Sequence, residues 1–139
     1  MRTYKLTISY DGSRYQGWQR QATTDNTIQY ILEWSIGKLV GYRVHIDGSG
    51  RTDAGVHALG QVANFKTESK IPADRLPDAL NAKLPKDISI ISCEEVDIDF
   101  HARYNACGKT YRYLIYNKPY RSPLYKDLSY HVRYDLDLD

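Results

Sequence analysis

The chain centres on Gly48-Ser49-Gly50-Arg51-Thr52-Asp53-Ala54-Gly55-Val56-His57-Ala58, a glycine-rich stretch between two segments with strand-like sequence. Before it, Tyr42, Val44 and Ile46 alternate with polar residues, and after it residues 61–65 return to an apolar pattern. Alternation with a period of two is typical of a half-buried strand. We therefore predict strand, turn and strand, with Asp53 on the turn.

The turn is a candidate catalytic site because it holds one carboxylate between a guanidinium and an imidazole. Glycines at positions 48, 50 and 55 permit positive φ angles and close backbone approach, so a ligand could come within contact distance of Asp53. The alternative is an ordinary connection, since Asp and Gly are common turn residues and a turn Asp often accepts only local N–H groups.

Elements on both sides of the turn complete a fold prediction. Strands are expected over about 3–10, 88–94 and 109–116, with the 88–94 strand buried on much of both faces. One helix should begin at Asn26 as N-cap and end at Gly41, and a second should span about 73–83, between Pro72 and Pro85. The order matches a split βαβ unit, an α+β fold with an antiparallel ferredoxin-like or RRM-like sheet and helices on one face.

Composition suits one globular domain over residues 1–139, with 42% hydrophobic residues and a formal net charge of +2. The distribution of charge is more informative, because residues 100–126 contain no Asp or Glu while Lys and Arg are interleaved with Tyr. Cations suit phosphates and aromatic rings suit unstacked bases, so this segment resembles an RNA surface. A tyrosine-rich β-hairpin with a solvated basic face explains it equally well.

Cys93 and Cys107 fit neither a disulfide framework nor a zinc site, because no Cys-x-x-Cys or paired His spacing accompanies them. We expect both thiols to serve as small apolar residues in a reducing compartment. No signal-peptide pattern and no membrane-spanning apolar run occurs in the sequence, which predicts a soluble, cytoplasmic protein.

Several motifs together resemble one family. Gly50-Arg51-Thr52-Asp53-Ala54-Gly55-Val56-His57 is similar, residue for residue, to the catalytic motif of the TruA-like tRNA pseudouridine synthases. The family's other motifs follow the same order here, as Tyr10-Asp11-Gly12-Ser13-Arg14-Tyr15-Gln16-Gly17-Trp18-Gln19-Arg20-Gln21, Leu80-Asn81-Ala82-Lys83-Leu84-Pro85, Phe100-His101-Ala102-Arg103-Tyr104 and Tyr111-Arg112-Tyr113. The chain matches the N-terminal half of the family's catalytic domain.

The resemblance implies isomerisation of uridine to pseudouridine in the anticodon stem-loop of tRNA, with Asp53 as the catalytic carboxylate. Asp53 could act as a nucleophile or as a base, and the sequence does not choose between these roles. The reaction yields an isomer, so no cofactor and no metal is expected. The expected partners are tRNA and a second copy of the chain in a homodimer, with no DNA and no membrane.

The resemblance also suggests residues that bind the substrate. Tyr111 matches the family tyrosine that stacks on the target base, and Arg51 would favour an ionised Asp53 or fill the space left by the flipped base. Arg14 and Arg20 are expected to meet phosphates, and Arg103 and Arg112 belong to the basic, tyrosine-rich segment. We expect Trp18 to be packed and His57 to be a structural hydrogen-bonding residue. The stretch Cys107-Gly108-Lys109-Thr110 is less basic than the family pattern.

Two alternatives stand beside the enzyme. Because the second half of the family's cleft is absent, the chain could be a catalytically incompetent RNA-binding half-domain. It could also fold only as a dimer or with a complementary chain, since half of a two-part domain would expose an apolar patch.

Overall fold

The computed structural model describes residues 1–138 and divides the chain into two compact units, Met1–Cys107 and Gly108–Asp139. The first unit holds the long strands and both helices, and the second holds two short strands. Each unit is described by itself.

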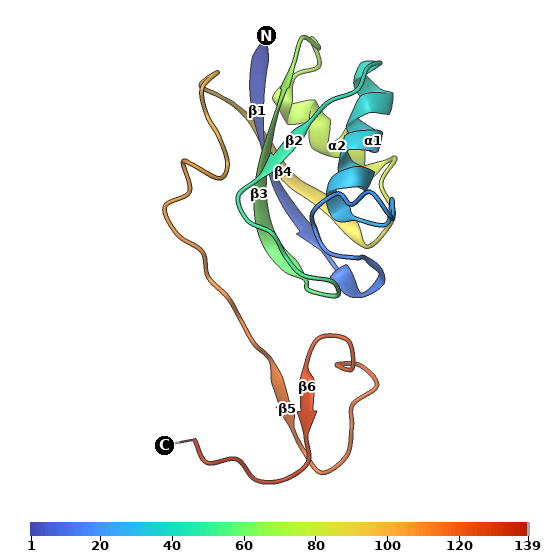
Figure 1. The fold of residues 1–139 in the computed structure, drawn as a ribbon, viewed down its shortest axis with the longest axis vertical. Coiled ribbons are helices and arrows are strands. Elements are labelled where there is room, and N and C mark those ends of the chain that lie inside the picture. The colour runs from blue at the N-terminus through green and yellow to red at the C-terminus, as the bar shows by residue number, and fades with distance from the viewer. Residues whose placement is uncertain (139) are drawn as a thin grey trace. The chain divides into compact units, whose positions relative to one another are not determined.

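The first unit is built on a four-stranded antiparallel sheet with the strand order β2-β3-β1-β4 (Figure 1). Its strands are β1 (Arg2–Tyr10), β2 (Ile46–Gly48), β3 (Ala58–Thr67) and β4 (Ile88–Val96). With α1 between β1 and β2, and α2 between β3 and β4, this is the topology of a split βαβ unit. The predicted α+β fold is confirmed.

Helix α1 (Ile28–Val40) ends as predicted, at Gly41 with a φ of 91° in the left-handed region that glycine tolerates. Its start differs by one residue, because Thr27 is the N-cap and its hydroxyl accepts the Tyr30 N–H. Helix α2 (Leu76–Asn81) is shorter than predicted. Residues 73–75 form a 3-10 turn ahead of it, and Pro77, which has no N–H to donate, is placed in its first turn.

Both helices cover one face of the sheet (Figure 1), and the core lies between them and β1. Tyr4, Leu6 and Ile8 of β1 are fully buried on this face. The opposite face carries polar side chains such as Lys5, which forms an ion pair of 2.6 Å with Glu94 of β4. Alternation along β1 therefore separates core from polar face, as its sequence predicts.

The segment after β4 runs along this polar face. The Thr3 hydroxyl donates to the Ile98 carbonyl at 3.0 Å, and the Ala102 N–H donates to the Asn64 side chain at 2.6 Å. These bonds explain why Thr3 and Asn64 are buried although they point away from the helices.

Three strand predictions were wrong. The residues before β2, 42–45, lie outside any strand. In β4, Ile88 and Ile90 are buried but Ile91 is 56% exposed, so this strand buries one face only. Residues 109–114 form no strand, and β5 (Ile115–Asn117) pairs in parallel with β6 (Tyr130–Val132). Tyr111 and Tyr113 are about four-fifths exposed, so no burial of their rings offsets the entropy of ordering that segment.

The two cysteines lie in different environments. Cys93 packs against the core, and burial with the nearby Glu94 raises the pKa of its thiol to about 12, whereas Cys107 is exposed. No helix within residues 1–138 has the length and apolar character needed to cross a bilayer.

Candidate active site

Asp53 lies at the exposed tip of the loop between β2 and β3. The Val56 N–H donates to the Asp53 carbonyl at 3.1 Å and closes a four-residue turn, in which Gly55 has a φ of 81°. A positive φ at the third position of such a turn suits glycine. The backbone of Asp53 is thus held by a tight turn while its carboxylate faces solvent.

The loop of residues 11–20 packs against this turn and forms backbone hydrogen bonds with it. The Trp18 N–H donates to the Thr52 carbonyl at 3.0 Å, and the Gly55 N–H donates to the Tyr15 carbonyl at 3.2 Å. Gly17 is required at its position, because its φ is 86° and a Cβ there would lie 2.6 Å from the Thr52 oxygen. Two motifs about forty residues apart in the sequence therefore form one unit.

Aromatic packing secures the same unit. Trp18 is 3% exposed, as predicted, and its ring stacks on Tyr10 with the ring centroids 6.3 Å apart. A Cβ at Gly48 would lie 2.7 Å from the Trp18 ring, so the close approach predicted for this glycine is made by the chain's own indole. Burial raises the pKa of Tyr10, whose hydroxyl stays protonated at neutral pH and bonds the Thr52 hydroxyl at 2.7 Å.

His57 joins the two motifs at the other end of the turn. Its Nδ1 accepts the Gly12 N–H at 3.0 Å and lies 3.1 Å from an Asp11 carboxylate oxygen. Both contacts join His57 to the loop of residues 11–20. The predicted structural hydrogen-bonding role of His57 is confirmed.

The Gln61 side chain bonds the start of the loop between β2 and β3. Its side-chain amide donates to the Gly50 carbonyl at 2.6 Å, and its oxygen accepts the Ser49 hydroxyl at 2.9 Å. These two hydrogen bonds were not predicted from the sequence, because a glutamine in a strand has no local pattern that points to a loop twelve residues earlier.

Arg51 and Asp53 are both exposed, and among residues 1–138 no hydrogen bond or ion pair joins their side chains. The local arrangement thus leaves the carboxylate and the guanidinium open to a ligand. Such a carboxylate can attack an electrophilic carbon or accept a proton.

The other predicted site residues belong to several different segments. Arg14 is exposed in the loop under Asp53, and the Arg103 guanidinium stacks on the Tyr104 ring at 5.8 Å. Arg20 is bound to Glu33 of α1 at 2.8 Å. Tyr111 and Arg112 belong to the second unit, where both are exposed. The structure brings Asp53, Arg51 and Arg14 to one pair of loops.

Glu33 is a buried carboxylate, 6% exposed, that ties α1 to β2. It accepts the Arg20 guanidinium and, at 3.1 Å, the Ile46 N–H, and His45 Nδ1 lies 3.3 Å from it. The amide of Gln29 donates to the Ile46 carbonyl at 3.0 Å. This network fixes the start of β2, the strand that leads into the Asp53 loop.

We expect Glu33→Ala to lower the free energy of unfolding by about 2 kcal/mol, because the Ile46 N–H loses its partner inside the protein. Glu33→Gln should lower the free energy of unfolding by less, since its amide oxygen can still accept the Ile46 N–H. Urea denaturation measures both, with the exposed Glu95→Ala as a control. Equal losses in Glu33→Ala and Glu95→Ala would contradict the role of the network.

The carboxylate of Asp11 predicts a pH dependence of stability. Hydrogen bonds from the Ser13 hydroxyl and N–H, with weaker contributions from His57 and Arg14, lower the pKa of Asp11 below its ordinary 3.8. Ionised Asp11 therefore stabilises the fold above that pH, and the stabilisation is lost as the pH falls through the lowered value. Melting temperatures between about pH 6 and pH 2 should fall less steeply for Asp11→Asn than for the unsubstituted chain. An identical fall would show that Asp11 does not contribute.

No cluster of three or more potential metal-ligating side chains occurs within residues 1–138.

Comparison with known proteins identifies a family that this chain matches. A family model described as tRNA pseudouridine synthase matches residues 6–105. A tRNA pseudouridine synthase A of Caldicellulosiruptor saccharolyticus is 55% identical over 138 residues, which are 99% of this chain and 56% of the relative. The protein of that name from Acetivibrio thermocellus is 54% identical over 139 residues, all of this chain and 57% of the relative. A tRNA pseudouridine synthase A 2 of Bacillus cereus is 49% identical over 138 residues, 99% of this chain and 56% of the relative. The chain thus spans little more than half the length of these curated relatives.

Proposed function

The chain belongs to the tRNA pseudouridine synthase family, and from this premise we propose that it isomerises uridine to pseudouridine in tRNA with Asp53 as the catalytic carboxylate. The observation that carries the proposal is the presentation of Asp53. Its turn is held by hydrogen bonds from two motifs, and its carboxylate lies at the exposed tip. A rigid backbone beneath an accessible carboxylate is what a positioned nucleophile or base requires.

The reaction breaks the bond between C1′ of the ribose and N1 of the uracil, and forms a bond between C1′ and C5. C5 loses its proton to solvent and N1, freed from C1′, takes up a proton, so that product and substrate are isomers. Asp53 has three available roles: attack on C1′, attack on C6 of the base, or removal of the 2′ proton. A target base inside a stacked stem-loop must leave the stack before any of these steps.

Other side chains belong to the proposal as substrate ligands. Arg51, two residues from Asp53, and Arg14, in the supporting loop, are exposed cations suited to phosphates near the target nucleotide. Tyr111, with its ring 81% exposed, is proposed to stack on the target base. The exposed Arg103 and Arg112 would bind the backbone. For Arg20 the phosphate role competes with its bond to Glu33.

We further propose that the target lies in the anticodon stem-loop, that the protein acts in the cytoplasm as a homodimer, and that residues 1–139 form the N-terminal half of the catalytic domain. A binding-only function is the second candidate, because the exposed basic and tyrosine side chains would bind RNA without any turnover. In that case the chain grips tRNA without turnover.

Tritium release from tRNA labelled with [5-³H]uridine tests the proposal, because forming the new C1′–C5 bond expels that hydrogen. Release by the 139-residue chain would support the synthase. A folded chain that binds tRNA and releases no tritium would exclude turnover by this chain and favour the second candidate.

A further inference from the structure

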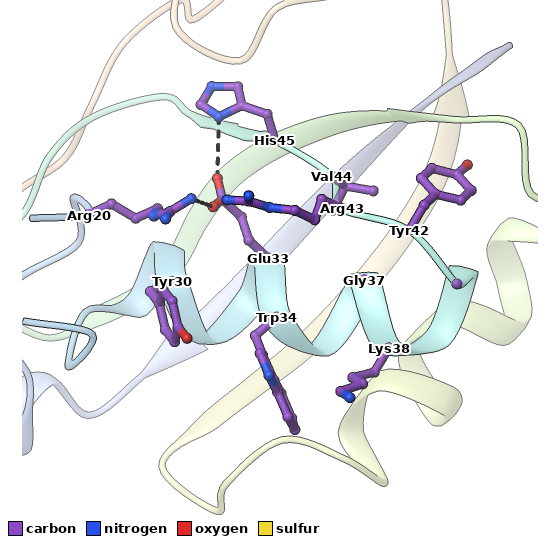
Figure 2. A pocket seen from close by; sticks show the side chains of 11 residues that line it. Arg20, Tyr30, Glu33, Trp34, Gly37, Lys38, Tyr42, Arg43, Val44 and His45 are labelled. Atoms are coloured by element: carbon purple, nitrogen blue, oxygen red, sulfur yellow. Dashed lines mark hydrogen bonds and ion pairs between the residues drawn. The ribbon is translucent and has the colours of Figure 1, made fainter. Parts of the chain in front are cut away.

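A groove of about 880 Å³ lies along α1 (Figure 2). Its walls are side chains of α1, the segment of residues 42–45 that leads into β2, and Arg20. A Cβ at Gly37 would lie 3.2 Å from the Tyr42 carbonyl oxygen, so the absence of a side chain there lets the segment of residues 42–45 pack closely on α1.

Positive charge predominates in the groove. Arg20, Lys38 and Arg43 are three permanent cations, and Glu33 is the one carboxylate among the lining residues. Glu33 forms its ion pair with Arg20, and the three cations against one carboxylate leave the lining with an excess of positive charge. Lys38 and Arg43 are exposed, and neither forms an ion pair with a carboxylate within residues 1–138. Two cations therefore remain for an anionic ligand.

Aromatic rings lie beside these cations. Trp34 is 52% exposed, so about half of its surface is open to a ligand. The Lys38 ammonium lies 5.4 Å from the Trp34 ring, and the Arg20 guanidinium lies 5.5 Å from the Tyr30 ring. Tyr30, Trp34 and Lys38 project from the same side of α1 (Figure 2). Over these residues the helix rises about 12 Å, room for more than one nucleotide.

We propose that this groove binds a single-stranded segment of RNA, with phosphates at Lys38 and Arg43 and a base against Trp34. The inference rests on the proposed function for the identity of that RNA, which is the strand of the substrate tRNA beyond the target nucleotide. Cations interleaved with exposed aromatic rings suit unpaired RNA, whereas a duplex offers no free base to stack.

The path of the chain connects the groove to the candidate active site. The Trp18 N–H bonds the Thr52 carbonyl, one residue from Asp53, and Arg20 follows two residues after Trp18. Two residues extend the chain by at most roughly 7 Å. Arg20, which lines the groove, is thus close in the chain to the loop that holds the Asp53 turn.

The test uses binding of an unmodified tRNA transcript, and of an oligouridine about twelve nucleotides long, followed by fluorescence anisotropy over a range of salt. The double substitution Lys38→Gln/Arg43→Gln should weaken tRNA binding about tenfold near 0.1 M salt. It should also reduce the slope of log K against log salt concentration by about 1.4, because two phosphate contacts to a single strand are lost. Trp34→Ala should weaken oligouridine binding about tenfold through lost stacking. The matched control is Lys70→Gln/Arg75→Gln, which removes the same charges from exposed positions outside the groove.

Binding of both RNAs by the groove variants as tight as by the control, or no RNA binding by the unsubstituted chain, would overturn the inference. A change in oligomeric state with unchanged RNA binding would identify a protein interface and overturn it too. Tritium release separates this result from the proposed function. If release persists while the groove variants bind normally, only the groove inference fails. If the groove variants lose binding while the unsubstituted chain releases no tritium, only the proposed catalysis fails.

Discussion

Asp53→Asn will reduce tritium release from [5-³H]uridine-labelled tRNA by at least about 10³-fold, because an amide can neither attack carbon nor accept a proton at neutral pH. The substitution is nearly isosteric, and the side chain is exposed at the tip of its turn. The turn itself is closed by backbone groups and by the supporting loop, so Asp53→Asn should leave the free energy of unfolding and the affinity for tRNA nearly unchanged.

Asp74→Asn is the matched control, an exposed aspartate in the 3-10 turn before α2. It should release tritium at the rate of the unsubstituted chain. Full activity of Asp53→Asn would remove Asp53 from the chemistry. Loss of tRNA binding together with release would instead assign Asp53 a binding role.

Gly12→Ala should have the largest effect on the fold of the site. A Cβ at position 12 would lie 1.9 Å from the Val56 carbonyl oxygen, a distance no structure tolerates without moving backbone. The Gly12 N–H also donates to His57, so the supporting loop and the Asp53 loop must separate together. We expect a loss of roughly 3 kcal/mol in the free energy of unfolding.

Gly12→Ala should also reduce tritium release by about 10²-fold, even where the protein remains folded, because Asp53 is displaced relative to the substrate. Gly108→Ala is the control, since a Cβ there meets no atom within 4 Å and its backbone φ is not positive. The free energy of unfolding of Gly108→Ala should lie within about 0.5 kcal/mol of that of the unsubstituted chain. Equal stability of both variants would show that the close packing of Gly12 on Val56 is not maintained in solution.

The alternation of β1, the glycine that ends α1 and the glycine-rich turn were readable because each is a local pattern of a few residues. The same kind of reasoning failed for residues 109–114, where tyrosines alternate with polar residues yet form no strand. Strand propensity is realised only when a neighbouring strand and a buried face are available. Neither condition is written in the segment itself.

The sequence by itself determined the order of the elements in the first unit and the turn that carries Asp53. Only the tertiary structure decided how that turn is held. It showed that Gly12 and Gly17 let a distant loop pack beneath it, that Gln61 clamps its base, and that Arg20 bonds a buried Glu33. It also placed Lys38, Arg43 and Trp34 in the lining of one groove. Backbone conformation follows from neighbouring residues, whereas these contacts join residues far apart in the chain and exist only once the sheet and helices have packed.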